Sequence, residues 1–171
     1  MIIALAGRRT DAPGATIPRF PLENVAAVRE RIYAFFVDHK ATTLVCSAAC
    51  GADLLALDVA GELGIRRRIV LPFEQTRFRT ISVVDRPGEW GALFDRIIRE
   101  VQAEGNLVIL SNDGEDEAIF ATTNGVILDE ALTLARQMPH DKGELSENPV
   151  LAMLVWDGQS RGEGDVTANF A

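Results

Sequence analysis

Residues 42–64 read TTLVCSAACGADLLALDVAGELG, which is a short β-type run, a turn of small residues and a helical pattern in succession. The turn ends at Gly51. Apolar side chains recur along one side of the helical pattern, at Leu55, Val59 and Leu63. A strand followed by a tight turn and a helix is the unit from which parallel sheets with crossover helices are built. This stretch therefore predicts an α/β fold.

The same alternation continues on both sides of this stretch. Strands are predicted at residues 2–6, 42–46, 68–73, 106–110 and 150–156, and helices at residues 23–39, 52–62, 90–101 and 118–137. Residues 74–88 have no clear period and are predicted to form an irregular binding loop. The pattern predicts a Rossmann-like, doubly wound and mostly parallel sheet of five or slightly more strands, with helices on both faces. The sequence stops where a further helix is expected to continue.

Composition places the chain among globular proteins. It has 171 residues, of which 47% are hydrophobic and 25% are charged, so we expect one Rossmann-like nucleotide-binding domain over residues 1–171. No apolar run approaches the roughly 20 residues of a membrane helix, and the first residues lack a positively charged signal region, so a cytoplasmic location is expected. Cys46 and Cys50 are two ligands short of a zinc site and are predicted to be reduced thiols.

The net charge of the chain limits the kinds of partner that it is expected to bind. The formal net charge is −8, which disfavours a surface that neutralises many phosphates of an extended nucleic acid. The 17 basic residues are almost all arginine, whose planar fork suits a phosphate or carboxylate group. A small anionic ligand fits this balance, although a general bias of composition is the favoured explanation for the arginines. The run at residues 66–68 is predicted to be a solvated face.

Candidate binding residues follow the predicted strands. In a doubly wound sheet, ligands bind outside the carboxyl ends of the strands, where helix N-termini present free N–H groups. Glycine in these turns lets backbone N–H groups approach an oxyanion, hydroxyl groups add donors, and arginine adds a cationic fork. The candidate ligand-binding residues are Gly7, Arg8, Arg9, Ser47, Gly51, Asp53, Gly162, Gly164 and Thr167.

Several of these residues also have a purely structural interpretation. Each glycine fits a turn requirement, and Asp53 suits either a ribose hydroxyl or the N–H groups of its own helix. Cys50 is predicted to be a packed thiol, because the sequence places no histidine beside it. Within the predicted loop, Glu74, Arg77 and Phe78 are candidate contacts to a base, and the alternative for Phe78 is an anchor to the core.

Four segments carry a family resemblance. They are GRRTD at residues 7–11, CSAACGADLLA at 46–56, VLPF at 70–73 with Phe78, and WDG at 156–158 running into GDVT at 164–167. In this order they resemble the SLOG superfamily, which includes the DprA/Smf DNA-uptake proteins and the LOG "lysine decarboxylase-like" phosphoribohydrolases. The chain is most similar to its nucleotide-sensing branches. The resemblance implies a Rossmann-like fold that binds a nucleotide or an ADP-ribose-like ligand, and a homodimer.

One departure from the family pattern decides between binding and hydrolysis. LOG-type hydrolases carry a Gly-Gly-x-Gly-Thr-x-x-Glu signature, and Phe170 stands here at the position of its glutamate. Cleavage of an N-glycosidic bond needs a carboxylate, so we predict nucleotide binding or sensing, with no catalytic residue, cofactor or metal. One alternative is a phosphoribohydrolase of nucleoside 5′-monophosphates in which another acid replaces the missing glutamate. The acids that could do so are Asp53, Glu74, Asp157 and Glu163. A second alternative is DprA-like binding of single-stranded DNA.

Overall fold

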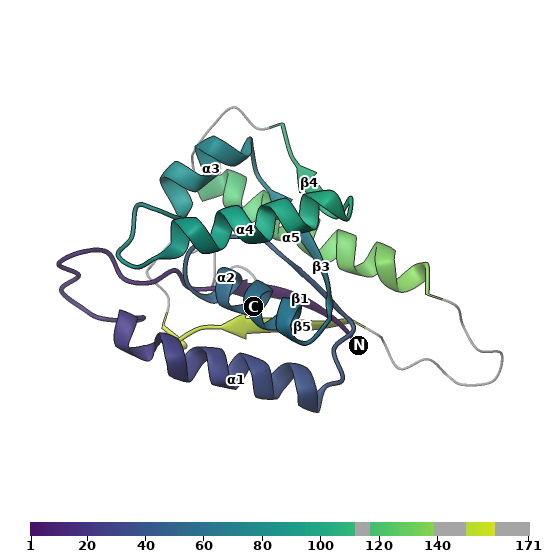
Figure 1. Cartoon of the computed structure of the whole chain (residues 1–171), viewed down its shortest axis with the longest axis horizontal. Helices are drawn as coiled ribbons and strands as arrows, with labels where there is room; N and C mark the ends of the chain where they lie inside the picture. Colours follow the sequence, from purple (N-terminus) through teal and green to yellow (C-terminus); the bar gives the residue numbers. More distant parts are fainter. Residues whose placement is uncertain (112–116, 139–149, 160–171) are drawn as a thin grey trace.

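Five strands form one parallel sheet in the computed structural model, in the order β4-β3-β2-β1-β5 (Figure 1). The structure describes residues 1–111, 117–138 and 150–159. The strands are β1 (Ile2–Gly7), β2 (Thr43–Cys46), β3 (Arg66–Leu71), β4 (Leu107–Ile109) and β5 (Val150–Val155). All four strand pairs are parallel, which confirms the predicted Rossmann-like α/β class.

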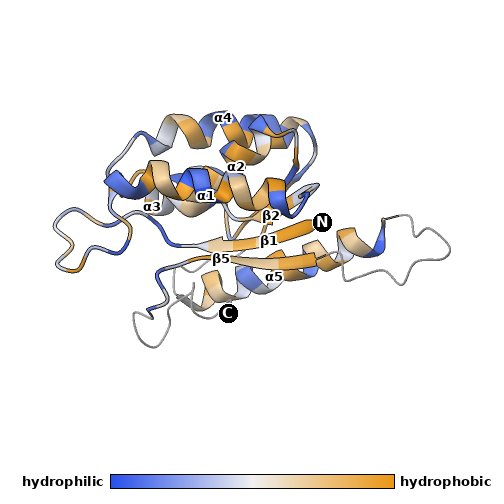
Figure 2. Cartoon of the chain, turned by 90° about the horizontal axis from the view of Figure 1, so that it is seen from below, coloured by the Kyte–Doolittle hydropathy of each residue, from blue (hydrophilic) through white to orange (hydrophobic). Residues whose placement is uncertain are grey.

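Helices cover both faces of the sheet, as predicted. The α-helices are α1 (Val25–Asp38), α2 (Ala52–Glu62), α3 (Gln75–Ser82), α4 (Trp90–Ala103) and α5 (Glu117–Arg136), and a short 3-10 turn η1 (Leu22–Asn24) precedes α1. Figure 2 shows α1 to α4 on one side of the sheet and α5 on the other. Strands β2, β3 and β4 follow one another on one side of β1, and β5 lies on the other side of β1. The direction in which strands are added to the sheet therefore reverses between β1 and β5.

The core lies on both faces of β1 because successive strand side chains point to opposite sides. Ile3 and Leu5 pack in the larger cluster, with α2 and α4. Ile2 and Ala4 pack in the smaller cluster under α5, with Ile127. This arrangement explains why β1 is an uninterrupted apolar run in the sequence.

The segment between β3 and α4 differs from its prediction as an irregular loop. Residues Gln75–Ser82 form α3, because Glu74 caps its start and accepts hydrogen bonds from the N–H groups of Thr76 (2.8 Å) and Arg77 (3.1 Å). Phe78 is buried, and its ring centroid lies 6.1 Å from those of both Phe73 and Phe94. The prediction failed because one fully buried aromatic side chain in a short helix leaves almost no periodic signal.

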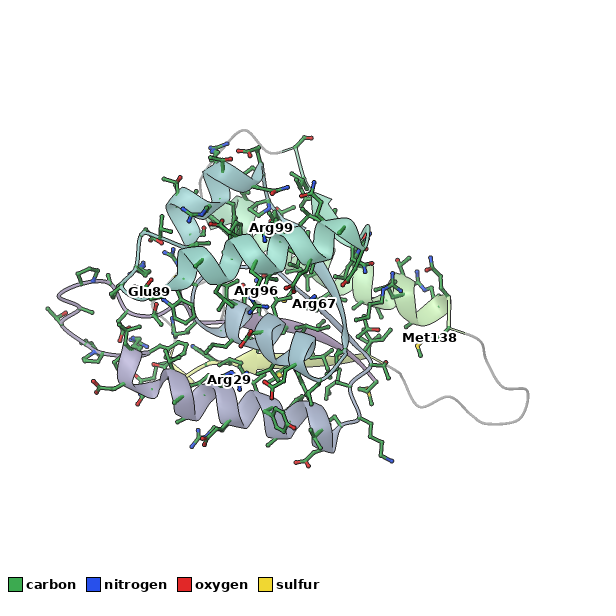
Figure 3. All side chains as sticks on the ribbon, in the orientation of Figure 1. Arg29, Arg67, Glu89, Arg96, Arg99 and Met138 are labelled. Atoms are coloured by element: carbon green, nitrogen blue, oxygen red, sulfur yellow. The ribbon has the colours of Figure 1, made fainter. Side chains whose placement is uncertain are left out.

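The arginines of residues 66–68 form a solvated face only in part, because Arg66 is exposed whereas Arg67 is buried. Arg67 is buried, and its guanidinium lies 2.9 Å from Glu100 of α4. Arg96 connects the same Glu100 (3.3 Å) to Asp58 of α2 (2.7 Å), and Arg29 of α1 also binds Asp58 (3.2 Å). These ion pairs link α1, α2, α4 and β3 on one side of the molecule (Figure 3).

Helix α5 corrects the statement that no apolar run approaches the length of a membrane helix. By length and composition alone, residues Ala118–Arg136 are long and apolar enough to cross a membrane. In the fold, Ile127, Ala131 and Ala135 of this helix are buried in the smaller core cluster. The apolar composition of α5 therefore serves, at least along this side, to cover the sheet.

Phe78→Ala tests the anchoring of α3. The substitution leaves a cavity between two aromatic rings, and we expect the free energy of unfolding to fall by about 3–5 kcal/mol in urea titrations. Val84→Ala, at a residue that is 46% exposed, is the matched control and should change stability by less than about 0.5 kcal/mol. Equal effects of the two substitutions would contradict this role of Phe78.

Candidate functional site

The carboxyl ends of β1 and β5 meet where the strand order reverses. Gly7 and Val155 are paired in the sheet, and the N–H of Arg8 donates to the carbonyl of Val155 at 3.0 Å. In open parallel sheets this reversal leaves a crevice outside the strand ends, where ligands bind. The residues that follow β1 and β5 are therefore the first place to look for a site.

Two arginines converge there on one carboxylate. Arg8 is 4% exposed, and its Nε donates to Oδ1 of Asp157 at 3.1 Å. Arg19 donates from Nη1 to Oδ2 of the same carboxylate at 3.2 Å. Both guanidinium groups also donate to the carbonyl of Gln159. The site thus presents cationic forks at the position that the fold reserves for ligands.

Asp157 is held in its ionised form. Burial raises the pKa of its carboxyl, but hydrogen bonds from the Gln159 N–H and from Arg8, together with the charges of Arg8 and Arg19, outweigh this and hold the pKa below its usual range. An acid that stays ionised at neutral pH does not donate a proton readily. Arg8, Arg19 and Asp157 thus form a cluster of paired charges at the end of β5.

Arg19 was missed by sequence reasoning. It ends the segment between Asp11 and Phe20, whose backbone is closed by a 2.9 Å hydrogen bond from the Asp11 N–H to the Phe20 carbonyl. Oδ2 of Asp11 also accepts from the N–H groups of Arg19 (2.9 Å) and Phe20 (3.0 Å), and Phe20 is buried in the core. These contacts fix the position of Arg19. No spacing in the sequence connects Arg19 to Asp157, because they meet only through the pairing of β1 with β5.

Arg9 lies apart from this cluster. Its Nη1 donates to both carboxylate oxygens of Asp85 (3.0 and 2.9 Å) and to the Ile81 carbonyl (3.1 Å). Arg8 and Arg9, of which one was predicted to bind a phosphate as a cationic fork, therefore lie on different sides of the strand end. Arg9 ties the end of α3 to the β1 turn.

Gly7 and Gly51 allow the end of β1 to approach the start of α2. A Cβ atom on Gly7 would lie 2.3 Å from Cβ of Ala52, and one on Gly51 would lie 2.7 Å from the Arg8 carbonyl oxygen. Gly51 has φ 95°, a conformation that other residues rarely adopt. The Ala52 N–H at this helix start donates to the Arg8 carbonyl at 3.1 Å. Contacts within the chain are thus sufficient to explain both glycines.

Asp53 has an unusual environment in the first turn of α2. It is 7% exposed, its Oδ2 accepts from the Ala49 N–H at 3.2 Å, and its Oδ1 has no hydrogen-bond partner in the described part of the chain. Burial raises the pKa of this carboxyl to about 7, against the opposing effects of the Ala49 N–H and Arg9. The buried Oδ1 is closed to solvent, so a ribose hydroxyl reaches it only if the surrounding turn opens. Ser47 lies half-buried nearby in the sequence, just after β2.

Both cysteines are free and buried. Burial raises the pKa of the Cys50 thiol to about 11, and burial together with the Asp53 charge raises that of Cys46 well above its usual range. Thiols with raised pKa values are poor nucleophiles at neutral pH. The prediction of a packed thiol at Cys50 is confirmed.

The remaining predicted residues divide into two groups. Glu74 and Phe78 support α3 as described above, and Cζ of Arg77 lies 4.5 Å from the centre of the Phe73 ring. Because Phe78 is 1% exposed, its ring is not available to stack on a base, and its interpretation as an anchor is confirmed. The predictions for Gly162, Gly164, Thr167 and Phe170 lie outside the described residues.

Comparison with known proteins found no relative of this chain. No protein-family model matches the chain, and no curated protein or solved structure matches it either. Among residues 1–111, 117–138 and 150–159, no group of three or more His, Cys, Asp or Glu side chains is placed to hold a metal ion.

Gly7→Ala tests the close approach of β1 and α2. The new methyl group overlaps Ala52, and we expect a loss of about 1–3 kcal/mol in the free energy of unfolding. The matched control is Gly125→Ala on α5, where a Cβ atom meets nothing within 4 Å. Alanine favours a helix, so this variant should be as stable as the native chain or up to about 1 kcal/mol more stable. A Gly7→Ala variant as stable as the control would contradict the packing argument.

The raised pKa of the Asp53 carboxyl predicts that the stability of the fold depends on pH. Its carboxyl titrates near 4 when unfolded and at about 7 when folded, so only the folded state holds this proton between those values. The stabilisation is complete below about pH 4 and is lost as the pH rises towards 7. Asp53→Asn should therefore be more stable than the native chain at pH 8 and should flatten the decline in urea titrations from pH 5 to pH 8. Asp129→Asn, at an exposed position on α5, should keep the native slope.

Proposed function

We propose that this chain binds a nucleotide or a nucleotide-derived ligand, such as a nucleoside monophosphate or an ADP-ribose-like molecule, at the carboxyl edge of the sheet. The observation that carries the proposal is the buried guanidinium of Arg8 at the reversal of the strand order, with Arg19 beside it. Guanidinium groups bind carboxylate and phosphate groups through the same paired N–H donors, so two arginines at the strand ends where such folds bind ligands favour an anionic ligand.

We further propose membership of the SLOG superfamily, near its nucleotide-sensing branches, with a cytoplasmic location and a homodimeric state. The support is the set of quoted segments and their placement. GRRTD follows β1, the small-residue turn precedes α2, and WDG follows β5, so all three stand at carboxyl ends of strands. This is the edge at which such folds bind their ligands.

Binding without turnover fits the site better than hydrolysis does. Both oxygens of Asp157 accept hydrogen bonds from arginines, which engages this carboxylate in ion pairs. Phe170 stands at the position of the glutamate in the LOG-type signature, which also favours binding over hydrolysis. Extended single-stranded DNA is a less favourable ligand because the formal net charge of the chain is −8.

Thermal unfolding with AMP, ADP-ribose and adenosine tests this function. A ligand at 100 times its Kd stabilises the folded state by about 2.7 kcal/mol, so AMP or ADP-ribose should raise the melting temperature measurably. Adenosine, which carries no phosphate, should give a smaller shift. No shift with either phosphorylated ligand would refute the proposal, and release of adenine from AMP in a chromatographic assay would favour the hydrolase instead.

Arg8→Gln should remove the shift, with circular dichroism to confirm that the variant is folded. The matched control is Arg136→Gln, which removes one positive charge at the end of α5, an exposed position at the opposite edge of the sheet. The control should keep the full shift. Equal shifts for the two variants would assign the binding to another part of the molecule.

A further inference from the structure

Several hydrogen-bond donors of the described chain converge on one carbonyl group at the end of β5. Arg8, Arg19 and the indole Nε1 of Trp156 all donate to the carbonyl oxygen of Gln159. A carbonyl oxygen has two lone pairs, so three donors share two acceptor positions. Nη1 of Arg19 is divided further, because it contacts both this carbonyl (2.8 Å) and Asp157 (3.2 Å). An anionic acceptor placed here would receive hydrogen bonds from both guanidinium groups.

Asp157 occupies the place that such an acceptor would take. Its two oxygens are divided between the two arginines, with Oδ1 bound to Arg8 and Oδ2 bound to Arg19. Two oxygens of a phosphate group bind a pair of guanidinium groups in the same way. The Asp157 side chain is 25% exposed and lies beyond the last paired residue of β5, so it can turn away without breaking the sheet.

We propose that Asp157 is an internal competitor, whose carboxylate holds the position between Arg8 and Arg19 that the anionic group of the ligand takes on binding. Arg19 is then the second anion-binding arm of the site. The inference rests on the proposed function for the identity of the ligand. The inference adds Arg19, which the sequence did not indicate, to the binding residues. It also implies that competition from Asp157 lowers the affinity for the ligand.

The Asp11–Phe20 segment gives Arg19 a fixed starting position. Asp11 accepts hydrogen bonds from the N–H groups of Arg19 and Phe20, and Phe20 is held in the core. The Arg19 side chain is 17% exposed, so its guanidinium faces both Asp157 and the surface. A fork that is already positioned loses little conformational entropy when Asp157 is exchanged for a ligand oxygen.

Calorimetric titration of three chains tests the exchange. The chains are the native one, Asp157→Asn, and the double variant Asp157→Asn with Arg19→Gln; the probes are AMP, ADP-ribose, inorganic phosphate and adenosine. Asparagine keeps the size of the side chain but removes the competing charge. We expect Asp157→Asn to bind AMP at least tenfold more tightly than the native chain and the second substitution to reverse that gain. Adenosine binding should not change.

The outcomes separate this inference from the proposed function. If the native chain binds AMP and Asp157→Asn binds it no more tightly, the competition is refuted and the function stands. If no chain binds AMP or ADP-ribose, the function is refuted, and tighter binding of inorganic phosphate by Asp157→Asn would still support the competition. If Asp157→Asn does not fold, the single variant Arg19→Gln tests whether Arg19 binds the anionic group of the ligand. It should weaken AMP binding about tenfold, and unchanged binding would overturn the role of Arg19.

Discussion

The parallel pairing of β1 with β5 is the constraint on which the candidate site depends. It brings Arg8, which follows the first strand, beside Asp157, which follows the last, although they are far apart in the chain. The same pairing is the point at which the strand order reverses, so the crevice expected of the fold and the charge cluster coincide. Without this pairing, neither Arg8 nor Arg19 would have its described carboxylate partner.

The burial of Arg8 determines which groups surround it at the carboxyl ends of β1 and β5. A guanidinium removed from water is costly to leave unpaired, which explains why Asp157 and the Gln159 carbonyl surround it. The tight contact between the β1 turn and the start of α2, which requires glycine at positions 7 and 51, fixes the backbone from which Arg8 projects. Packing and electrostatics therefore meet at one strand end, and together they position the charge cluster that we propose as a binding site.

The sequence predicted the parts of the fold that depend on repeated local signals. The apolar runs gave all five strands, and the stripe on α4 from Trp90 to Val101 is buried as expected. Helix α3 was missed because a short helix with one fully buried aromatic side chain has little periodicity. Among the arginines at residues 66–68, Arg67 was misjudged because it is buried through partners on α4, which no local pattern indicates.

Sequence reasoning named residues at the strand ends but not the partners that their side chains have in the fold. Strand ends identified Gly7, Arg8 and Gly51, yet the direction of each side chain depends on distant elements. Arg9 turns to Asp85 and Arg8 to Asp157, a division that adjacent positions in a sequence do not reveal. Arg19 could not be found at all, since its partner lies across the β1–β5 pairing.

The most direct test of this account is a crystal structure of the chain with AMP or ADP-ribose bound. The account predicts a phosphate group within hydrogen-bonding distance of the Arg8 guanidinium, at the carboxyl ends of β1 and β5. A phosphate bound elsewhere on the molecule, with Arg8 still paired to Asp157 and distant from the ligand, would contradict it.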